Sequence, residues 1–143
     1  MNTVENLRLW FLTCPTVSNV LLLNADYIGT DTPECAIYSM PSTLKSYEDV
    51  CGNISYSGNQ VLNFIFALHA PHGEDTEQNL QNIQFFADLK DWMYEQNTLK
   101  NFPEIEEGSV KSIMPMKSQY VASATAGSAT YQMQCSINYW RDE

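Results

Sequence analysis

The fold of this chain is decided by the stretch from Asp75 to Gln96, DTEQNLQNIQFFADLKDWMYEQ, which has the pattern of one long helix. Asp75 and Gln78 have the spacing of a capping box, and the acidic residues around the first turn suit the positive end of the helix dipole. At about 100° per residue, one narrow stripe is polar and consists of Gln84, Asp88, Asp91 and Glu95. The other side carries Leu80, Ile83, Phe86, Leu89 and Met93, with Phe85, Trp92 and Tyr94 at its margins. We expect this apolar side to pack on a sheet, and its margins to meet a second helix or a partner chain.

Composition and charge describe a single globular domain over residues 1–143. The chain is 44% hydrophobic and 12% aromatic, which is enough to form a core without disulfides or metals. Its 7 Lys and Arg against 17 Asp and Glu leave a net charge of −10, which opposes binding to phosphate backbones. The sequence shows neither a secretory signal nor an apolar run of roughly 18 residues. We therefore expect a soluble protein made in a cytoplasm, with no direct nucleic-acid binding and no membrane attachment.

An opening helix and several strands accompany the long helix in the predicted fold. Asn2 and Glu5 have capping-box spacing before an apolar run that Cys14-Pro15 ends. Strands are predicted at residues 20–23, 34–40, 61–69, 109–116 and 130–139. The strand at 61–69 is apolar on both faces and should lie in the middle of the sheet, whereas Pro115 limits its strand to an edge or an end. This order predicts an α+β fold, with two helices packed on one face of a mixed or antiparallel sheet of about four to five strands.

The segments between these elements have turn or loop composition. Residues 29–33, GTDTP, are typical of a turn, and residues 41–58 form a polar excursion that contains at most one helical turn at 44–50. Residues 118–129 are rich in Ser, Ala and Thr and are predicted to form a mobile loop. The strand that follows has the cleanest alternation in the chain, with Tyr131, Met133, Cys135, Ile137 and Tyr139 on one face and Thr130, Gln132, Gln134, Ser136 and Asn138 on the other. One face should be buried, and the other should meet water or a neighbour.

The histidines and one cysteine are weak candidates for chemistry. His69 and His72 are three residues apart and could hold a metal if Glu74 joined them. A strand-end histidine followed by a loop histidine is the ordinary interpretation. Cys51 with His69 could form a nucleophile and its base, but no family signature surrounds them. We therefore expect no catalytic and no metal-binding residues among them.

The acidic pairs and the remaining cysteines point the same way. Glu106-Glu107 and Asp88-Asp91 are expected to be solvated, because acid–base catalysis needs two carboxylates in different environments. The cysteines at 14, 35, 51 and 135 include no Cys-x-x-Cys pair, which predicts reduced thiols and neither a zinc nor a redox site. Phosphate-binding, zinc-protease and nucleophile-elbow motifs are missing from the sequence. The residues thus predict no enzyme and no cofactor.

Aromatic and amide side chains suited to protein contacts gather near the end of the chain. They are Tyr120, Tyr131, Tyr139, Trp140, Gln119, Gln132 and Gln134. Tyrosine and tryptophan are enriched at interfaces, although the same residues can simply fill the surface and core of a sheet. Both interpretations stay open on the residues alone.

Several stretches together carry a resemblance. They are FADLKDWMYEQN (86–97), Phe102-Pro103 with the acidic turn that follows, Tyr120 before a loop, YQMQCSINYW (131–140), the opening helix ending in Thr13-Cys14-Pro15, and Ile37-Tyr38-Ser39 shortly before a proline. With these stretches the sequence resembles small proteins of the tail-assembly module of long-tailed phages and prophages. Such proteins are often labelled minor capsid proteins, and they are similar to the tail-terminator or tail-completion group. Residues 29–33 and 47–58 match least.

The resemblance implies both a fold and a role. It implies two helices against a sheet in a subunit that forms a ring, usually of six copies, which caps the tail tube and joins it to the head. The implied partners are other copies of the chain, the tail tube protein and a head-completion or connector protein, and the implied location is the tail or neck of the virion. An acidic wall would keep DNA phosphates from binding in such a ring. Other neck or minor capsid components, and a small ligand-binding domain or enzyme, remain as alternatives.

Overall fold

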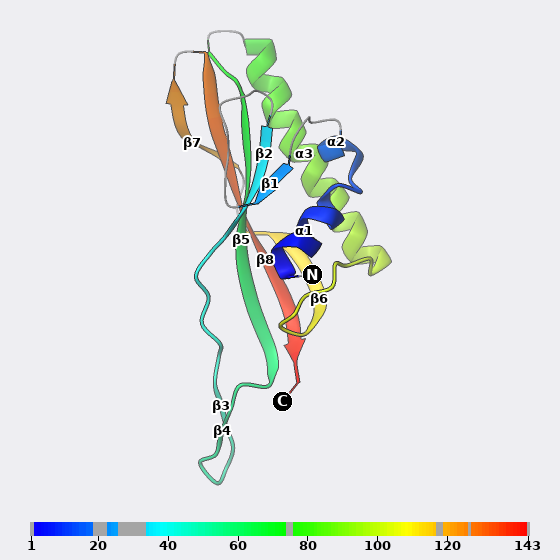
Figure 1. Cartoon of the computed structure of the whole chain (residues 1–143), viewed down its shortest axis with the longest axis vertical. Helices are drawn as coiled ribbons and strands as arrows, with labels where there is room; N and C mark the ends of the chain where they lie inside the picture. The colour runs from blue at the N-terminus through cyan, green and yellow to red at the C-terminus, as the bar shows by residue number, and fades with distance from the viewer. Residues whose placement is uncertain are drawn as a thin grey trace.

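In the computed structural model, the described residues form one six-stranded sheet, a separate two-stranded ladder and three helices (Figure 1). The structure describes residues 2–18, 23–25, 34–73, 76–116, 119–125 and 127–142. The helices are α1 (Thr3–Phe11), α2 (Pro15–Ser18) and α3 (Thr76–Leu99). The strands are β1 (Leu23–Ala25), β2 (Glu34–Ser39), β3 (Tyr47–Glu48), β4 (Ile54–Ser55), β5 (Gly58–Pro71), β6 (Ser109–Pro115), β7 (Tyr120–Thr125) and β8 (Ser128–Arg141). None of the described helices is both long enough and apolar enough to span a membrane.

The two long strands β5 and β8 form the centre of the main sheet. They pair antiparallel along their whole length, from Gly58 opposite Arg141 to Pro71 opposite Ser128. The order of the sheet is β1-β2-β5-β8-β6, and β7 pairs with the part of β8 that β6 leaves free. Among the strand pairs that the described residues form, β1–β2 alone is parallel. The prediction that residues 61–69 lie in the middle of the sheet is therefore confirmed, as is the edge position of the strand that contains Pro115.

The predicted strand count is too low. The main sheet has six strands where four to five were expected, because the Ser- and Ala-rich segment predicted as a mobile loop forms β7. Tyr120 lies opposite Gln132, and a bulge between Val121 and Ser123 shifts the register before the strand turns into β8. The ladder of β8 thus organises a segment whose composition alone favours a loop. The helical turn expected at residues 44–50 is also wrong, since β3 lies there.

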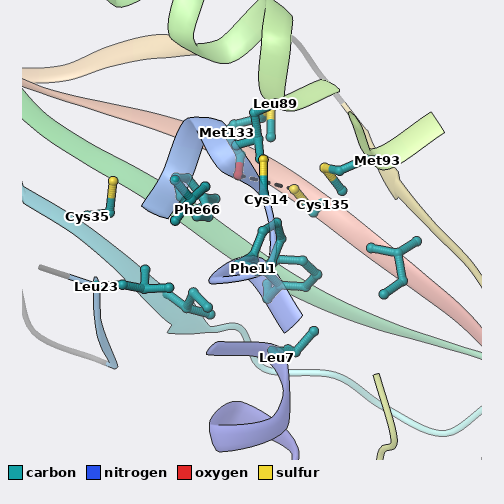
Figure 2. Packing of buried hydrophobic residues seen from close by; sticks show 14 of the residues in the cluster. Leu7, Phe11, Cys14, Leu23, Cys35, Phe66, Leu89, Met93, Met133 and Cys135 are labelled. Atoms are coloured by element: carbon teal, nitrogen blue, oxygen red, sulfur yellow. Dashed lines mark hydrogen bonds between the residues drawn. The ribbon is translucent and has the colours of Figure 1, made fainter. Parts of the chain in front are cut away.

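The core lies on the face of the sheet that α1 and α3 cover (Figure 1). The clean alternation of β8 predicts this face correctly, because its five odd-numbered residues from 131 to 139 are all buried. Figure 2 shows Phe11 of α1 against Phe66 of β5, with their ring centroids 5.0 Å apart, and Leu89 and Met93 of α3 close to β8. Burial of each such side chain contributes roughly 1.5–3 kcal/mol.

The first helix begins as the sequence predicts. The Asn2 side chain accepts a hydrogen bond from the backbone N–H of Glu5 at 2.9 Å, which satisfies a donor that the helix leaves unpaired. The helix ends at Phe11, and Pro15 starts the short helix α2, for which the sequence pattern gives no signal. Trp10 then anchors α1 to the end of α3, because its indole N–H donates to the carbonyl of Asn101 at 3.0 Å. The ring of Trp10 also lies 4.5 Å from that of Trp92.

The long helix is rotated relative to the predicted orientation. Its buried stripe consists of Asn82, Phe86, Leu89, Met93 and Gln96. Leu80 and Ile83, which were expected in the core, are 57% and 47% exposed. Asn82 takes a core position because its amide donates to the carbonyl of Pro71 at 2.8 Å and to the Tyr131 hydroxyl at 3.4 Å. The polar stripe from Gln84 to Glu95 is exposed as predicted, whereas the Asp75 cap lies outside the described residues.

Residues 20–22 of the predicted first strand and the predicted turn at 29–33 also lie outside the described residues. The part of that strand that is described, β1, pairs with β2 from Leu23 opposite Cys35 to Ala25 opposite Ile37. The strand predicted at residues 34–40 is present as β2 and pairs antiparallel with β5. These elements place β1 and β2 at one edge of the sheet and β6 and β7 at the other.

Candidate assembly surface

Residues 40–57 form an extended arm between β2 and β5, and we call this segment the arm. It leaves the sheet at the end of β2, pairs with itself through β3 and β4, and returns to the start of β5 (Figure 1). Every residue from 41 to 54 is exposed. The large apolar side chains that the arm displays are Leu44, Tyr47, Val50, Ile54 and Tyr56, with exposures of 38%, 37%, 105%, 64% and 48%. Isolated two-stranded ladders are marginally stable in water, so an arm of this kind needs additional contacts to keep its shape.

A buried glutamine fixes the base of the arm. The Gln60 side chain, 3% exposed, accepts a hydrogen bond from the backbone N–H of Lys45 at 2.7 Å. Its amide group donates to the carbonyls of Lys45 at 2.7 Å and of Tyr56 at 2.9 Å. One side chain of β5 therefore holds both the outgoing and the returning segment of the arm. The Tyr47 hydroxyl adds a third attachment, since it donates to the carbonyl of Asn59 at 2.7 Å.

The tip of the arm is closed by an aspartate turn. The Asp49 carboxylate accepts hydrogen bonds from the backbone N–H groups of Cys51 and Asn53, each at 2.9 Å, and Gly52 adopts a positive φ of 84°. These bonds, above all the one from the Asn53 backbone, hold the pKa of Asp49 below its ordinary value. The turn leaves the Val50 side chain pointing fully into solvent. A tip ordered in this way presents an apolar side chain without the entropy loss that a flexible loop would suffer on binding.

The predicted contact residues divide between the two faces of the sheet. Tyr131 and Tyr139 lie in the core, 5% and 2% exposed, so they are not available for contacts. Tyr120 and Trp140 are each 42% exposed on strands β7 and β8. The Tyr120 hydroxyl donates to Gln132 at 2.9 Å, which holds the exposed ring in place. Gln119 and Gln134 are half-buried. The alternation of β8 separates the two sets, because successive side chains point to opposite faces.

The histidines and Cys51 are not brought together. His69 lies near the far end of β5 with its Nδ1 3.0 Å from the Thr130 hydroxyl, and the His72 ring lies edge-on to the Tyr131 ring at 6.0 Å. Cys51 is at the tip of the arm, beyond the opposite end of β5. At about 3.3 Å per strand residue, the length of β5 alone puts roughly 35 Å between His69 and the arm. The pairing of a Cys51 nucleophile with a His69 base is therefore ruled out by geometry.

Metal-binding side chains do not gather anywhere in the part of the chain that the structure describes, where no group of three His, Cys, Asp or Glu side chains is placed to hold an ion. Glu74, the third ligand considered above, lies outside that part. Burial raises the pKa values of the Cys35 and Cys135 thiols, and a carboxylate at Glu34 raises that of Cys35 further, so these thiols are inert as nucleophiles.

The acidic pairs serve structural roles or face solvent. The Thr3 hydroxyl lies 2.7 Å and 3.1 Å from the two carboxylate oxygens of Glu107, and the backbone N–H of Glu106 donates to the Thr3 oxygen at 3.0 Å. This acidic turn therefore fastens the start of α1. Asp88 accepts a hydrogen bond from Gln84 at 2.7 Å on the exposed stripe of α3, and Asp91 is exposed on the same stripe.

Comparison with known proteins leaves the family of this chain open. No protein-family model matches the sequence, and no curated protein matches it. One matching solved structure aligns with 97% of this chain and 92% of its own length, at 11% sequence identity and a TM-score of 0.45. With so low a TM-score and identity, this likeness carries no argument about function.

Proposed function

We propose that this protein is a structural subunit of the tail of a long-tailed phage or prophage. In this proposal it is a tail-terminator or tail-completion protein, which forms a ring at the head-proximal end of the tail tube. Its partners are other copies of itself, the tail tube protein and a head-completion or connector protein, and it acts in assembly without a catalytic role. The proposal starts from the resemblance of residues 86–97 and 131–140 to such proteins.

The arm is the observation that carries the proposal. Its exposed apolar side chains, of which Val50 and Ile54 are the most exposed, are held in place by Gln60 at the base and Asp49 at the tip. A monomer gains nothing from holding apolar side chains out in water, because each loses hydrophobic stabilisation that burial would supply. A subunit that closes onto its neighbours gains that stabilisation on assembly. An ordered apolar arm thus supports a role in assembly.

The net charge and the sheet edges support the same role. A ring through which DNA travels must not retain phosphates, and a chain with a net charge of −10 repels them. The edge strands are short or irregular: β1 spans Leu23–Ala25, and β6 has a register shift between Val110 and Ser112 and ends at Pro115. Such edges resist open-ended strand pairing, so association through a defined arm is favoured over sheet extension.

Two alternative functions are another neck or minor capsid component and a small-ligand-binding domain. Another neck or minor capsid component would share these features and differ only in its position in the virion. A small-ligand site needs free polar groups converging in a pocket. The cavity between α1, β2 and β5 has a volume of about 260 Å³, and its lining combines apolar side chains with Asn2, Thr3, Ser39, Asn63, Glu106 and Glu107. Thr3 and Glu107 are already bonded to each other, whereas the buried Oδ1 of Asn63 has no hydrogen-bond partner among the described residues. One unpaired acceptor is not the converging set of polar groups that a ligand site needs, and the arm displays several exposed apolar side chains, so the assembly role is favoured.

Complementation of a deletion strain tests the proposal. The double variant Val50→Ser/Ile54→Ser should fold normally, since both side chains are exposed, but should fail to restore tail completion. The variant Leu80→Ser is the control, because it removes an apolar side chain outside the arm whose exposure, 57%, is close to the 64% of Ile54. Tails of uncontrolled length, or tails that fail to join filled heads, are expected from the deletion and from the double variant. Tails of normal length joined to full heads in the deletion strain would overturn the proposal, and empty or misshapen heads would point to a capsid role.

A further inference from the structure

A groove at the end of α3 gathers positive charge in an otherwise acidic chain. The groove has a volume of about 410 Å³ and is lined by Asn97, Lys100, Phe102, Val110 and Lys111. Two of the seven Lys and Arg residues of the whole sequence thus line one site. The concentration of scarce cations beside an apolar floor indicates a binding surface for a segment that is both acidic and apolar.

The walls of this groove are ordered. Two hydrogen bonds to the backbone of Ile113 fix the Asn97 side chain. Its amide group donates to the Ile113 carbonyl at 2.8 Å, and its Oδ1 accepts from the Ile113 backbone N–H at 2.9 Å. Phe102 and Val110 are half-buried and pack against the core, which makes them the floor. Lys111 is exposed, and its ammonium nitrogen lies 5.0 Å from the centre of the Trp140 ring. A ligand therefore meets a fixed apolar floor flanked by the positive charges of Lys100 and Lys111.

The tip of the arm has the complementary chemistry. Glu48 and Ile54 are register partners in the β3–β4 ladder, so their side chains lie on the same face of the arm. The other face carries Tyr47, which contacts the base of β5 at Asn59. This face thus combines a carboxylate with an exposed isoleucine, and the turn beyond it displays the fully exposed Val50. An acidic and apolar face of this kind matches the basic and apolar groove.

We infer that the arm tip of one copy docks in the Lys100–Lys111 groove of the next copy. This inference rests on the proposed function, since it names the surfaces by which the ring would form. The arm leaves the sheet between β2 and β5, whereas the groove adjoins β6 at the opposite edge (Figure 1). Contacts between two different surfaces of identical subunits are head-to-tail, and they close into rings when the rotation allows.

Charge argues against the other apolar hollow as the receptor. The cavity between α1 and β5 is rimmed by Glu106 and Glu107, which would repel the carboxylates of Glu48 and Asp49. The groove at the end of α3 contains Lys100 and Lys111 instead, which attract these carboxylates, so the groove is the favoured receptor for the arm tip.

Cross-linking at the arm tip tests the docking. Cys51 is the natural probe, because it is exposed at the tip while Cys14, Cys35 and Cys135 are buried. The variant Ser109→Cys places a second thiol on an exposed residue two positions from Lys111. A short bismaleimide applied to the full-length protein at its highest soluble concentration should give covalent oligomers through Cys51 and residue 109. The variant Glu95→Cys, exposed on the polar stripe of α3, is the control and should give far fewer.

Charge reversal in the Ser109→Cys background adds the decisive comparison. Glu48→Lys and Lys111→Glu should each lower the yield of cross-linked oligomers about fivefold to tenfold, because each replaces an attraction by a repulsion. The two changes together should restore most of the yield. Yields equal to those of the Glu95→Cys control, no oligomers at all, or no rescue in the double variant would overturn the inference. If the inference fails while Val50→Ser/Ile54→Ser still blocks tail completion, the arm keeps its proposed role and another surface receives it.

Discussion

The orientation of α3 can be measured with a pair of leucine substitutions. Leu89 is fully buried against the sheet, whereas Leu80, on the same helix, is 57% exposed. The hydrophobic pattern of the sequence places both on the apolar side. Because both positions are inside the helix, Leu→Ala changes helix propensity equally at each and the difference reports burial alone.

The expected magnitudes differ clearly. Leu89→Ala leaves a cavity in the core and should lower the free energy of unfolding by about 2.7–5 kcal/mol. Leu80→Ala removes a side chain that is already mostly in water, and it should cost less than about 1 kcal/mol. Urea unfolding followed by circular dichroism measures both values. With a slope of about 1–3 kcal/mol per molar urea, the two midpoints should differ by roughly 0.6 M or more. Equal losses at the two positions, or a larger loss at Leu80, would show that the helix is turned the other way.

Three further predictions concern the arm and a tight contact. Gln60→Leu should leave the backbone groups of Lys45 and Tyr56 without their partner and make the arm more sensitive to limited proteolysis than in the wild type. An unchanged rate of cleavage would show that the Gln60 hydrogen bonds do not hold the arm. Gly108→Ala should lower the thermal midpoint, because a Cβ atom there would lie 2.1 Å from the carbonyl oxygen of Trp140, and an unchanged midpoint would show that this contact relaxes freely. The pKa of Asp49 is lowered, so the tip turn should be fully formed above the ordinary carboxyl pKa and should loosen as pH falls through the lowered value. Carbon NMR of the Asp49 carboxyl group should show a midpoint below that of a free aspartate, and a midpoint at or above it would contradict the turn.

Local patterns predict the elements that local interactions specify. The capping of α1 by Asn2 is confirmed, since the bond forms between residues three apart. The buried face of β8 is confirmed because strict alternation leaves only one apolar face. The predicted rotation of α3 is wrong because buried polar side chains occupy core positions. Asn82 and Gln96 are buried through bonds to Tyr131 and Asn101, residues far along the chain or beyond the helix end, and no helical pattern contains that information.

The arm and β7 depend still more on distant partners. Residues 44–50 contain enough apolar residues for a helical turn, but the aspartate turn after them and the Gln60 clamp give an extended ladder instead. The signal that could have revealed the turn is Asp49 followed by Gly52 and Asn53, which are typical turn residues. The composition of β7 favours a loop, and only its pairing with β8 makes it a strand. The charged groove next to Lys111 joins residues from α3 and β6, so the sequence alone does not bring it together.

Negative-stain imaging of tails assembled with and without this protein is a direct test of its proposed role as a tail terminator. We expect tails assembled with the protein to have one uniform length and a capped end that is joined to a head. Without it, tails should vary in length or remain detached from heads that are full of DNA. Tails of uniform length joined to full heads in the absence of the protein would show that it is not the tail terminator.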